Sequence, residues 1–153
     1  ELVKRIKNYD GIIASRYVHG SIIAPKPSLE RIFASRIFNF FIRIILGLRF
    51  KDTQCGAKLF KRKALEKTLP KLTFSQLAFD VDLLYNIKKQ GFKIKEIPTT
   101  WSDEEYSKVN FAKSGPVMFL AIIRLRILNS PFKSLIKFYD KLINNIIRKI
   151  NYK

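Results

Sequence analysis

The sequence predicts a mixed α/β domain, because segments with the spacing of short strands alternate along the chain with segments that have the spacing of helices. The chain has 153 residues, of which 47% are hydrophobic, so it has enough apolar surface to fold despite a formal net charge of +18. Its length suits one domain or part of one. The single cysteine and the single histidine exclude a disulfide framework and a zinc site of the finger type.

The first predicted strand is a short apolar run at residues 12–15, and Arg16 follows directly at its carboxyl end. Ligands of open α/β sheets bind at such ends. The residues before this strand have the pattern of the end of a helix, and the glycine and prolines within residues 19–28 predict a loop after it. A helix is then predicted over residues 29–48, with Gly47 as its stop signal.

This long helix has an unusual distribution of polar residues. Its polar positions recur every four residues and form one narrow stripe, made of Arg31, Ser35, Asn39 and Arg43. A surface helix of a soluble protein normally shows the reverse, an apolar stripe on a polar body. We therefore expect the stripe to face water or an anion, and the apolar remainder to face a core or lipid. Arg36 and Arg43 are interpreted as lipid headgroup contacts or snorkelling side chains.

The middle of the chain continues the alternation of strand and helix patterns. The predicted elements are a turn at residues 51–56, a strand at 57–60, a helix at 62–69 closed by Pro70, a helix at 77–90 closed by Gly91, and a strand at 92–98. Asp80 and Asp82 form a D-x-D pair, but they lie in a predicted helix, where residues two apart face different directions. We therefore do not expect this pair to bind a metal.

The last third of the chain is amphipathic. A loop is predicted over residues 101–113, a very apolar helix over 116–128, and an amphipathic helix with a basic face over 132–150. A basic amphipathic helix suits the surface of an anionic membrane. No apolar run reaches the roughly 18–20 residues that a spanning helix needs, so we expect peripheral attachment. The predicted division is an α/β part at residues 1–110 and membrane-interface helices at 111–153.

The net charge of +18 implies a partner rich in anions, which could be nucleic acid, an anionic membrane or a phosphorylated substrate. The positive charge is spread evenly along the chain, so there is no separate basic arm. No recognisable nucleic-acid-binding motif is present, and the inverted helix at residues 29–48 would be hard to explain in such a protein. We therefore do not expect a nucleic acid partner.

Six blocks of sequence, in a fixed order, carry a resemblance to a known family. They are D-G-I-I-A-S-R-Y at residues 10–17, R-x-x-x-S-R at 31–36, D-T-Q-C-G-A-K-L-F at 52–60, F-D-V-D-L-L-Y at 79–85, E-I-P at 96–98, and Trp101 with S-K at 107–108. Together they resemble the carboxyl-terminal half of the polyprenyl-phosphate glycosyltransferases, over about residues 8–128. The third and fourth blocks are most similar to the family members that transfer glucose or mannose to dolichyl phosphate.

The resemblance implies a GT-A fold with a mixed sheet, of which this chain would form the acceptor half. It also implies transfer of a hexose, glucose before mannose, from a nucleotide diphosphate sugar to a polyprenyl phosphate, with inversion, at the cytoplasmic face of a membrane. A divalent cation, Mg²⁺ or Mn²⁺, is expected for the complete enzyme. The family carries its acidic D-x-D metal motif and its nucleotide-binding strands in its first half, so we expect no metal ligand in this chain. The start at Glu1 is interpreted as a cut edge or a processed terminus.

A different class of function stays open at this point. The chain could instead be a non-catalytic peripheral membrane protein left by a truncated or split gene. It would then bind lipid in a salt-dependent way and transfer no sugar.

The resemblance also assigns roles to individual residues. Arg16, Arg31 and Ser35 match the family's contacts to the acceptor phosphate, a role that suits the planar donor fork of arginine. Ser107 and Lys108 match an S-K pair near the substrate phosphates. A lone arginine at a strand end is otherwise more often a structural or solvated charge.

Other polar residues have simpler interpretations. Asp52 and Gln54 either organise their turn through local backbone bonds, which is the commoner role, or lie near the donor sugar or the phosphates. Cys55 is interpreted as a small packed residue and His19 as a solvated loop residue.

Overall fold

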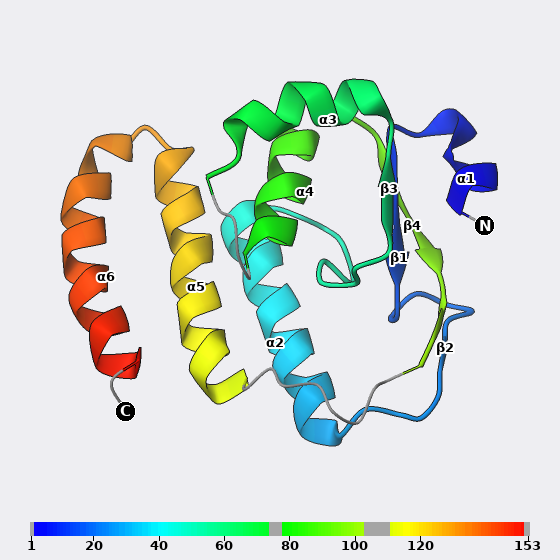
Figure 1. The fold of residues 1–153 in the computed structure, drawn as a ribbon, viewed down its shortest axis with the longest axis horizontal. Helices are drawn as coiled ribbons and strands as arrows, with labels where there is room; N and C mark the ends of the chain where they lie inside the picture. Colours follow the sequence, from blue (N-terminus) through cyan, green and yellow to red (C-terminus); the bar gives the residue numbers. More distant parts are fainter. Residues whose placement is uncertain (1, 74–77, 103–110, 152–153) are drawn as a thin grey trace.

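The computed structural model describes residues 2–73, 78–102 and 111–151, and it shows a mixed α/β arrangement (Figure 1). A three-stranded sheet has the order β3-β1-β4. Its strands are β1 (Gly11–Ser15), β3 (Lys58–Phe60) and β4 (Ile94–Pro98). The central strand β1 pairs in parallel with β4 and antiparallel with β3. The predicted mixed α/β class is therefore confirmed.

Two very short strands form a second, parallel pair. They are β2 (Ile22–Ile23) and β5 (Thr100–Trp101). Strand β2 lies in the predicted loop at 19–28, and Trp101 of β5 lies in the predicted loop at 101–113, so the loop predictions are wrong at these positions. A two-residue strand has no periodicity of its own, because its pairing depends on a partner far away in the sequence.

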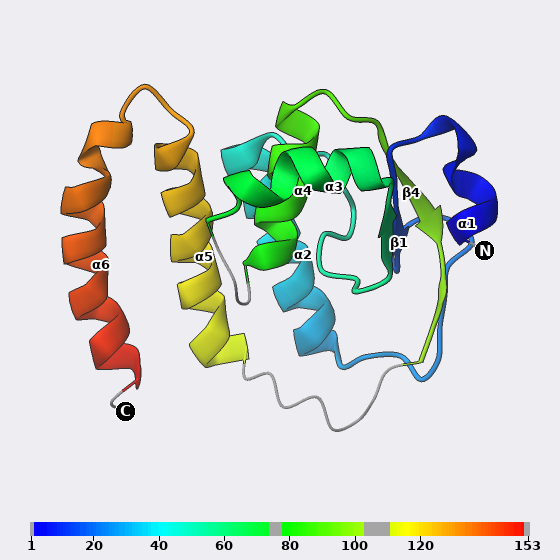
Figure 2. The same cartoon turned by 45° about the horizontal axis from the view of Figure 1, so that its top comes forward.

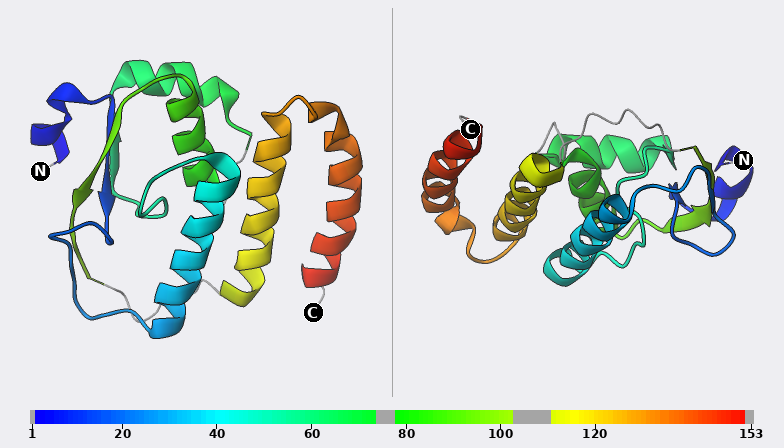
Figure 3. Two further views of the ribbon diagram at one scale, coloured as in Figure 1. Left: turned by 180° about the vertical axis from the view of Figure 1, so that it is seen from behind. Right: turned by 90° about the horizontal axis from the view of Figure 1, so that it is seen from below.

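The helices lie in layers beside the sheet (Figures 1 and 2). Their bounds are α1 (Leu2–Arg5), α2 (Leu29–Leu46), α3 (Arg62–Thr68), α4 (Phe79–Lys89), α5 (Phe111–Leu128) and α6 (Ile136–Asn151). Short 3-10 turns follow or precede them at Ile6–Asn8, Leu69–Lys71 and Lys133–Leu135. Helices α2 and α4 lie on one side of the sheet and α1 on the other. Helices α2, α5 and α6 follow one another outward from the sheet, and the views from behind and below show the same order (Figure 3).

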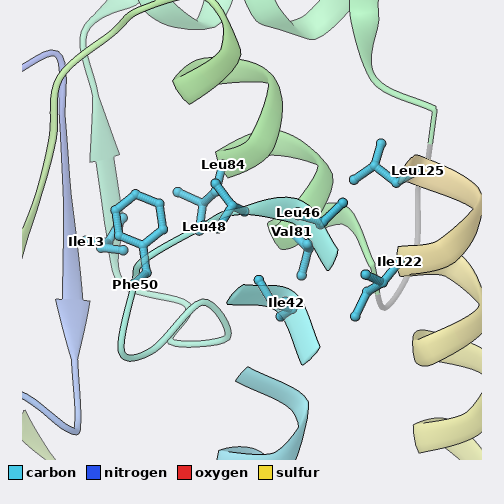
Figure 4. Packing of buried hydrophobic residues seen from close by; sticks show 9 residues of the cluster. All are labelled: Ile13, Ile42, Leu46, Leu48, Phe50, Val81, Leu84, Ile122 and Leu125. Carbon is cyan, nitrogen blue, oxygen red and sulfur yellow. The ribbon is translucent and has the colours of Figure 1, made fainter. Parts of the chain in front are cut away.

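The hydrophobic core lies where β1, α2, α4 and α5 meet (Figure 4). It consists of Ile13, Ile42, Leu46, Leu48, Phe50, Val81, Leu84, Ile122 and Leu125. All five residues of β1 are buried, as is usual for a central strand that is covered on both faces. Helix α5 contributes two residues to this core, so the core joins the sheet region to the C-terminal helices.

The boundaries of α2 follow local signals that can be read in the sequence. Ser28 is the N-cap, and its side chain accepts a hydrogen bond from the backbone N–H of Arg31. Gly47 has a φ of 68°, and its N–H donates to the carbonyl of Arg43. Glycine adopts this left-handed conformation without steric cost, so the helix ends here, as predicted.

Other predicted boundaries need correction. Helix α5 begins at Phe111 and not at residue 116, because the backbone continues through Pro116 at the loss of one helical hydrogen bond. The predicted loop at residues 101–113 is therefore wrong at its end, while residues 103–110 lie outside the described part. The predicted helix at 132–150 is a 3-10 turn followed by α6. Within the described residues, no helix combines the length and the apolar character needed to cross a membrane.

Candidate functional site

The carboxyl ends of the parallel strands β1 and β4 bring together the polar residues of the candidate site. Arg16 and Tyr17 follow β1 directly, and Trp101 lies in β5, just after β4. Ser35 of α2 is linked to this group by a hydrogen bond with Tyr17, described below. This is the sheet edge at which the sequence predicts a ligand.

Arg16 is held by a buried carboxylate. Its Nε lies 2.7 Å from Oδ2 of Asp52 and its Nη2 lies 3.0 Å from Oδ1, so the contact is bidentate. The backbone N–H of Arg16 donates to the same carboxylate at 3.1 Å. The Asp52 side chain is 0% exposed and that of Arg16 is 19% exposed. This contact fixes the plane of the guanidinium and makes the pair electrically neutral.

Arg16 keeps its positive charge although its side chain is largely buried. Burial by itself lowers the pKa of the Arg16 guanidinium, but the hydrogen bond and the negative charge of Asp52 raise it above its ordinary value. Arginine has five N–H donors, and Asp52 takes those of one edge. The donors of the other edge, formed by Nη1 and the second N–H of Nη2, point away from Asp52.

Two aromatic rings flank this guanidinium. The Arg16 Cζ lies 5.6 Å from the centroid of the Trp101 ring and 5.5 Å from that of Tyr17. The Cζ of Arg36 lies 5.2 Å from the same Tyr17 centroid. These are cation–π distances, so Tyr17 contacts both guanidiniums. Arg36, which the sequence predicts to contact lipid headgroups or to snorkel, lies on this ring, and its contact with lipid stays a prediction.

Ser35, one of the two predicted acceptor residues of α2, contacts Tyr17. The Tyr17 hydroxyl donates to Oγ of Ser35 at 3.1 Å, which links the strand end to the helix. Arg31 is half-buried and lies one turn before Ser35 on α2. Arg16 and Ser35 are therefore joined through Tyr17, and Arg31 adjoins them along α2. Sequence reasoning did not single out Tyr17 or Trp101, although both lie in the blocks that carry the family resemblance.

The loop that carries Asp52 is held by hydrogen bonds on two sides. The Glu96 carboxylate on β4 accepts the backbone N–H groups of Lys51, at 2.8 and 2.9 Å, and of Asp52, at 3.0 Å. On the other side, Oδ1 of Asn39 accepts from the backbone N–H and hydroxyl of Thr53 at 3.3 and 3.1 Å. The position of Asp52 is therefore fixed by both the sheet and α2.

These contacts correct the expectation for the polar stripe of α2. Asn39 is buried and faces the loop, not water or an anion. Further along the stripe, Nε of Arg43 donates to the carbonyl of Phe50 at 3.2 Å. The apolar side of the helix is partly exposed, at Leu29, Phe33, Ile37, Phe40 and Ile44. Two residues of the stripe, Asn39 and Arg43, thus bind the loop next to the site.

Gln54 and Asp52 show the local backbone bonding that the sequence suggested. The N–H of Gln54 donates to Oδ1 of Asp52 at 3.2 Å. The Nε2 atom of Gln54 is buried and has no hydrogen-bond partner in the described part of the chain. The proximity of these two residues to a sugar or phosphate stays a prediction.

The remaining candidates lie apart from this cluster. Asp80 pairs with Nζ of Lys58 at 2.8 Å, whereas Asp82 accepts from the backbone N–H of Thr73. These two carboxylates therefore bind different partners. Cys55 is buried, which raises the pKa of its thiol. His19 is exposed, and Ser107 and Lys108 lie outside the described residues.

A metal centre and a cleft in the described part of the chain are two alternative places for a ligand. Among the residues that the structure describes, no three histidine, cysteine or acidic side chains gather as metal ligands would. A cleft of about 410 Å³ is lined in part by Ala14, Ile97, Thr99 and Thr100. Its lining includes no charged residue, so it is not built to bind a phosphate.

Comparison with known proteins identifies relatives of one kind. The chain is 32% identical over 123 residues to dolichyl-phosphate beta-glucosyltransferase of Dictyostelium discoideum, which covers 78% of this chain and 37% of that protein. It is 39% identical over 95 residues to the Saccharomyces cerevisiae protein of the same name, covering 61% of this chain and 27% of the relative. It is also 30% identical over 113 residues to polyprenol monophosphomannose synthase of Mycolicibacterium smegmatis, covering 72% of this chain and 42% of the relative.

The chain spans less than half the length of these curated relatives. No family model matches the chain, and no solved structure matches it. The relatives nevertheless agree with one another and with the motif blocks, so the predicted resemblance is confirmed. The chain belongs to the family-2 glycosyltransferases, together with its dolichyl-phosphate and polyprenol relatives.

Proposed function

We propose that the chain forms the acceptor-binding half of an inverting glycosyltransferase that transfers a hexose from a nucleotide diphosphate sugar to a polyprenyl phosphate. The observation that carries the proposal is the oriented Arg16 guanidinium at the end of β1, connected through Tyr17 to Ser35. The names of the relatives support glucose or mannose as the sugar, and glucose is the more frequent of the two names.

The proposed reaction does not depend on a general base. The acceptor phosphate is already ionised, so the site has to position it and stabilise its charge. The phosphate oxygen forms a bond to the anomeric carbon while the bond from that carbon to the nucleotide phosphate breaks. Arg16 supplies oriented donors for the phosphate oxygens, and Ser35 and Arg31 supply further donors from α2.

A divalent cation would stabilise the nucleotide diphosphate as it leaves. The described residues offer no set of ligands for such an ion. We therefore propose that the cation and the nucleotide sugar bind to polypeptide that is not part of this sequence, which fits the share of the relatives' length that the chain spans.

We further propose that the chain lies on an anionic membrane at the cytoplasmic face, as a peripheral protein. The exposed apolar side of α2 supports this, because the opposite side of the same helix carries Ser35 toward the site. The C-terminal helices add exposed apolar residues next to exposed lysines. These residues are Phe132, Leu135, Phe138 and Leu142, with Lys133, Lys137 and Lys141.

Calorimetric titration of the chain with farnesyl phosphate, a short prenyl phosphate, tests the acceptor site. Farnesol, which has the same hydrocarbon and no phosphate, is the matched control. We expect saturable binding of farnesyl phosphate only, and binding about tenfold weaker in Arg16→Ala and Arg31→Ala. Equal binding of farnesol, or unchanged affinity in both variants, would contradict the proposal.

A second experiment addresses the sugar. The longer polypeptide from the same gene, if one exists, is supplied with UDP-glucose or GDP-mannose and a prenyl phosphate, and the product is identified by mass. We expect the glucosyl product. Salt-sensitive lipid binding without transfer from either donor would support a non-catalytic membrane protein instead.

A further inference from the structure

The Arg16–Asp52 pair has an electrostatic consequence for the proposed site. The positive charge of Arg16 is cancelled by a fully buried carboxylate at 2.7 Å. Such a pair presents oriented donors, but it contributes almost no net attraction for a phosphate that carries two negative charges. A phosphate monoester site that includes this pair therefore depends on cations other than Arg16 for its net positive charge.

Arg36 is a cation that lies on the ring of Tyr17, next to the Arg16–Asp52 pair. It is exposed, and in the described part of the chain the contact recorded for its guanidinium is the Tyr17 ring, at 5.2 Å. No carboxylate among the described residues neutralises it. Its charge is therefore available beside the neutral pair.

Tyr17 connects the two arginines to each other and to α2. Its ring contacts the guanidiniums of both Arg16 and Arg36, and its hydroxyl donates to Ser35, the residue before Arg36. An aromatic ring attracts a cation without neutralising it, whereas a carboxylate cancels its charge. Tyr17 thus restrains Arg36 near the site while leaving its charge and its donors available.

We propose that Arg36 is a third phosphate-binding arginine of this site, beside Arg16 and Arg31, and that Tyr17 is the positioning residue for Arg16 and Arg36. In this division of roles, Arg16 supplies oriented donors and Arg36 adds a net positive charge. The ligand class is a phosphate monoester, whether on a prenyl chain or free in solution. The inference rests on the proposed acceptor function and adds a residue to it.

The test compares Arg36→Gln with Arg126→Gln, because Arg126 is also exposed but lies in the last turn of α5. Both variants lose one positive charge from the surface of the chain. Farnesyl phosphate, inorganic phosphate and phosphatidylserine vesicles are the three probes. We expect Arg36→Gln to bind farnesyl phosphate about tenfold more weakly than the wild type, and Arg126→Gln to bind it unchanged.

The dependence on pH adds a readout that a merely structural role would not change. The second proton of a phosphate monoester leaves with a pKa of about 6, so the wild type should bind more tightly at pH 7.5 than at pH 5. We expect this gain to be smaller in Arg36→Gln, which lacks the added charge. Tyr17→Leu should resemble Arg36→Gln, whereas Tyr17→Phe keeps the ring and should retain most of the affinity.

Each alternative outcome has a distinct meaning. Equal losses in Arg36→Gln and Arg126→Gln would show that only overall charge matters, and would overturn the inference. A loss confined to phosphatidylserine vesicles would make Arg36 a headgroup contact and would also overturn it. Unchanged binding in Arg36→Gln with weaker binding in Arg16→Ala would overturn this inference alone, whereas absence of farnesyl phosphate binding in the wild type would overturn the proposed function with it.

Discussion

Two arginine–aspartate pairs in this molecule have almost the same geometry and different surroundings. At the candidate site, Nε and Nη2 of Arg16 lie 2.7 and 3.0 Å from the Asp52 carboxylate. Between α5 and α6, the same atoms of Arg124 lie 2.7 and 2.9 Å from that of Asp140. The side chains of the first pair are 19% and 0% exposed, and those of the second are 30% and 37% exposed.

The difference teaches that burial, not geometry, determines what each pair contributes. An exposed pair is screened by water and contributes about 0–1 kcal/mol. A buried charge that loses its partner costs several kcal/mol, because it has no water to replace the partner. We therefore expect the site to depend on its ion pair, and the α5–α6 region to depend on apolar packing.

The largest expected effect concerns that apolar packing. Ile122 of α5 is 1% exposed and belongs to the core that α5 shares with α2, α4 and the sheet. Ile122→Ala should lower the free energy of unfolding by about 4 kcal/mol, as measured by urea denaturation. Leu142→Ala, at an exposed position of α6, should change it by less than about 0.5 kcal/mol. Similar losses in both variants would show that α5 is not attached through the core.

The next effect concerns the buried pair. Asp52→Asn removes the charge that Arg16 depends on, and it weakens the acceptor for the N–H of Gln54. We expect a loss of about 3 kcal/mol in the free energy of unfolding, because Arg16 retains only partial access to water. A loss below about 1 kcal/mol would contradict this account, because the two pairs would then contribute equally to the free energy of unfolding.

The smallest effect is expected for Asp140→Asn, the matched substitution in the more exposed of the two pairs. The hydrogen bond from Arg124 lowers the pKa of Asp140 below its ordinary value of 3.8. Its contribution to stability is therefore present above that ordinary value and is lost as the pH falls through the lowered one. We expect a difference from the wild type of less than about 1 kcal/mol at pH 7, and a smaller one at pH 3 or in 1 M salt. A difference that grows on acidification would contradict this sign.

Local signals in the sequence predict much of the fold. The apolar run of β1 and the end of α2 at Gly47 depend on neighbouring residues, and the sequence predicts both close to their observed positions. The pairing of β2 with β5 depends on residues far apart in the chain, so no local pattern indicates it. Pro116 was interpreted as a helix start, but the packing of α5 against α2 outweighs the lost hydrogen bond.

In the candidate site, too, the sequence predicts some of the residues but not the contacts between them. The family blocks singled out Arg16, Arg31 and Ser35 as residues with a shared role, and the structure brings Arg16 and Ser35 together through Tyr17. The pairing of Arg16 with Asp52 joins residues that are 36 positions apart. Sequence reasoning assigned separate roles to these two residues, because a tertiary contact of this kind leaves no periodic signal.

The most direct test of the account follows the arginine side chains themselves during a titration with farnesyl phosphate. Nuclear magnetic resonance of the ¹⁵N-labelled chain resolves the Nε–Hε signals of Arg16 and of Arg124, which are bonded to carboxylates in the same way. We predict a saturable shift of the Arg16 signal, with the Arg124 signal unchanged. Equal shifts of both signals, or a stationary Arg16 signal while farnesyl phosphate binds, would contradict the assignment of the acceptor site to the end of β1.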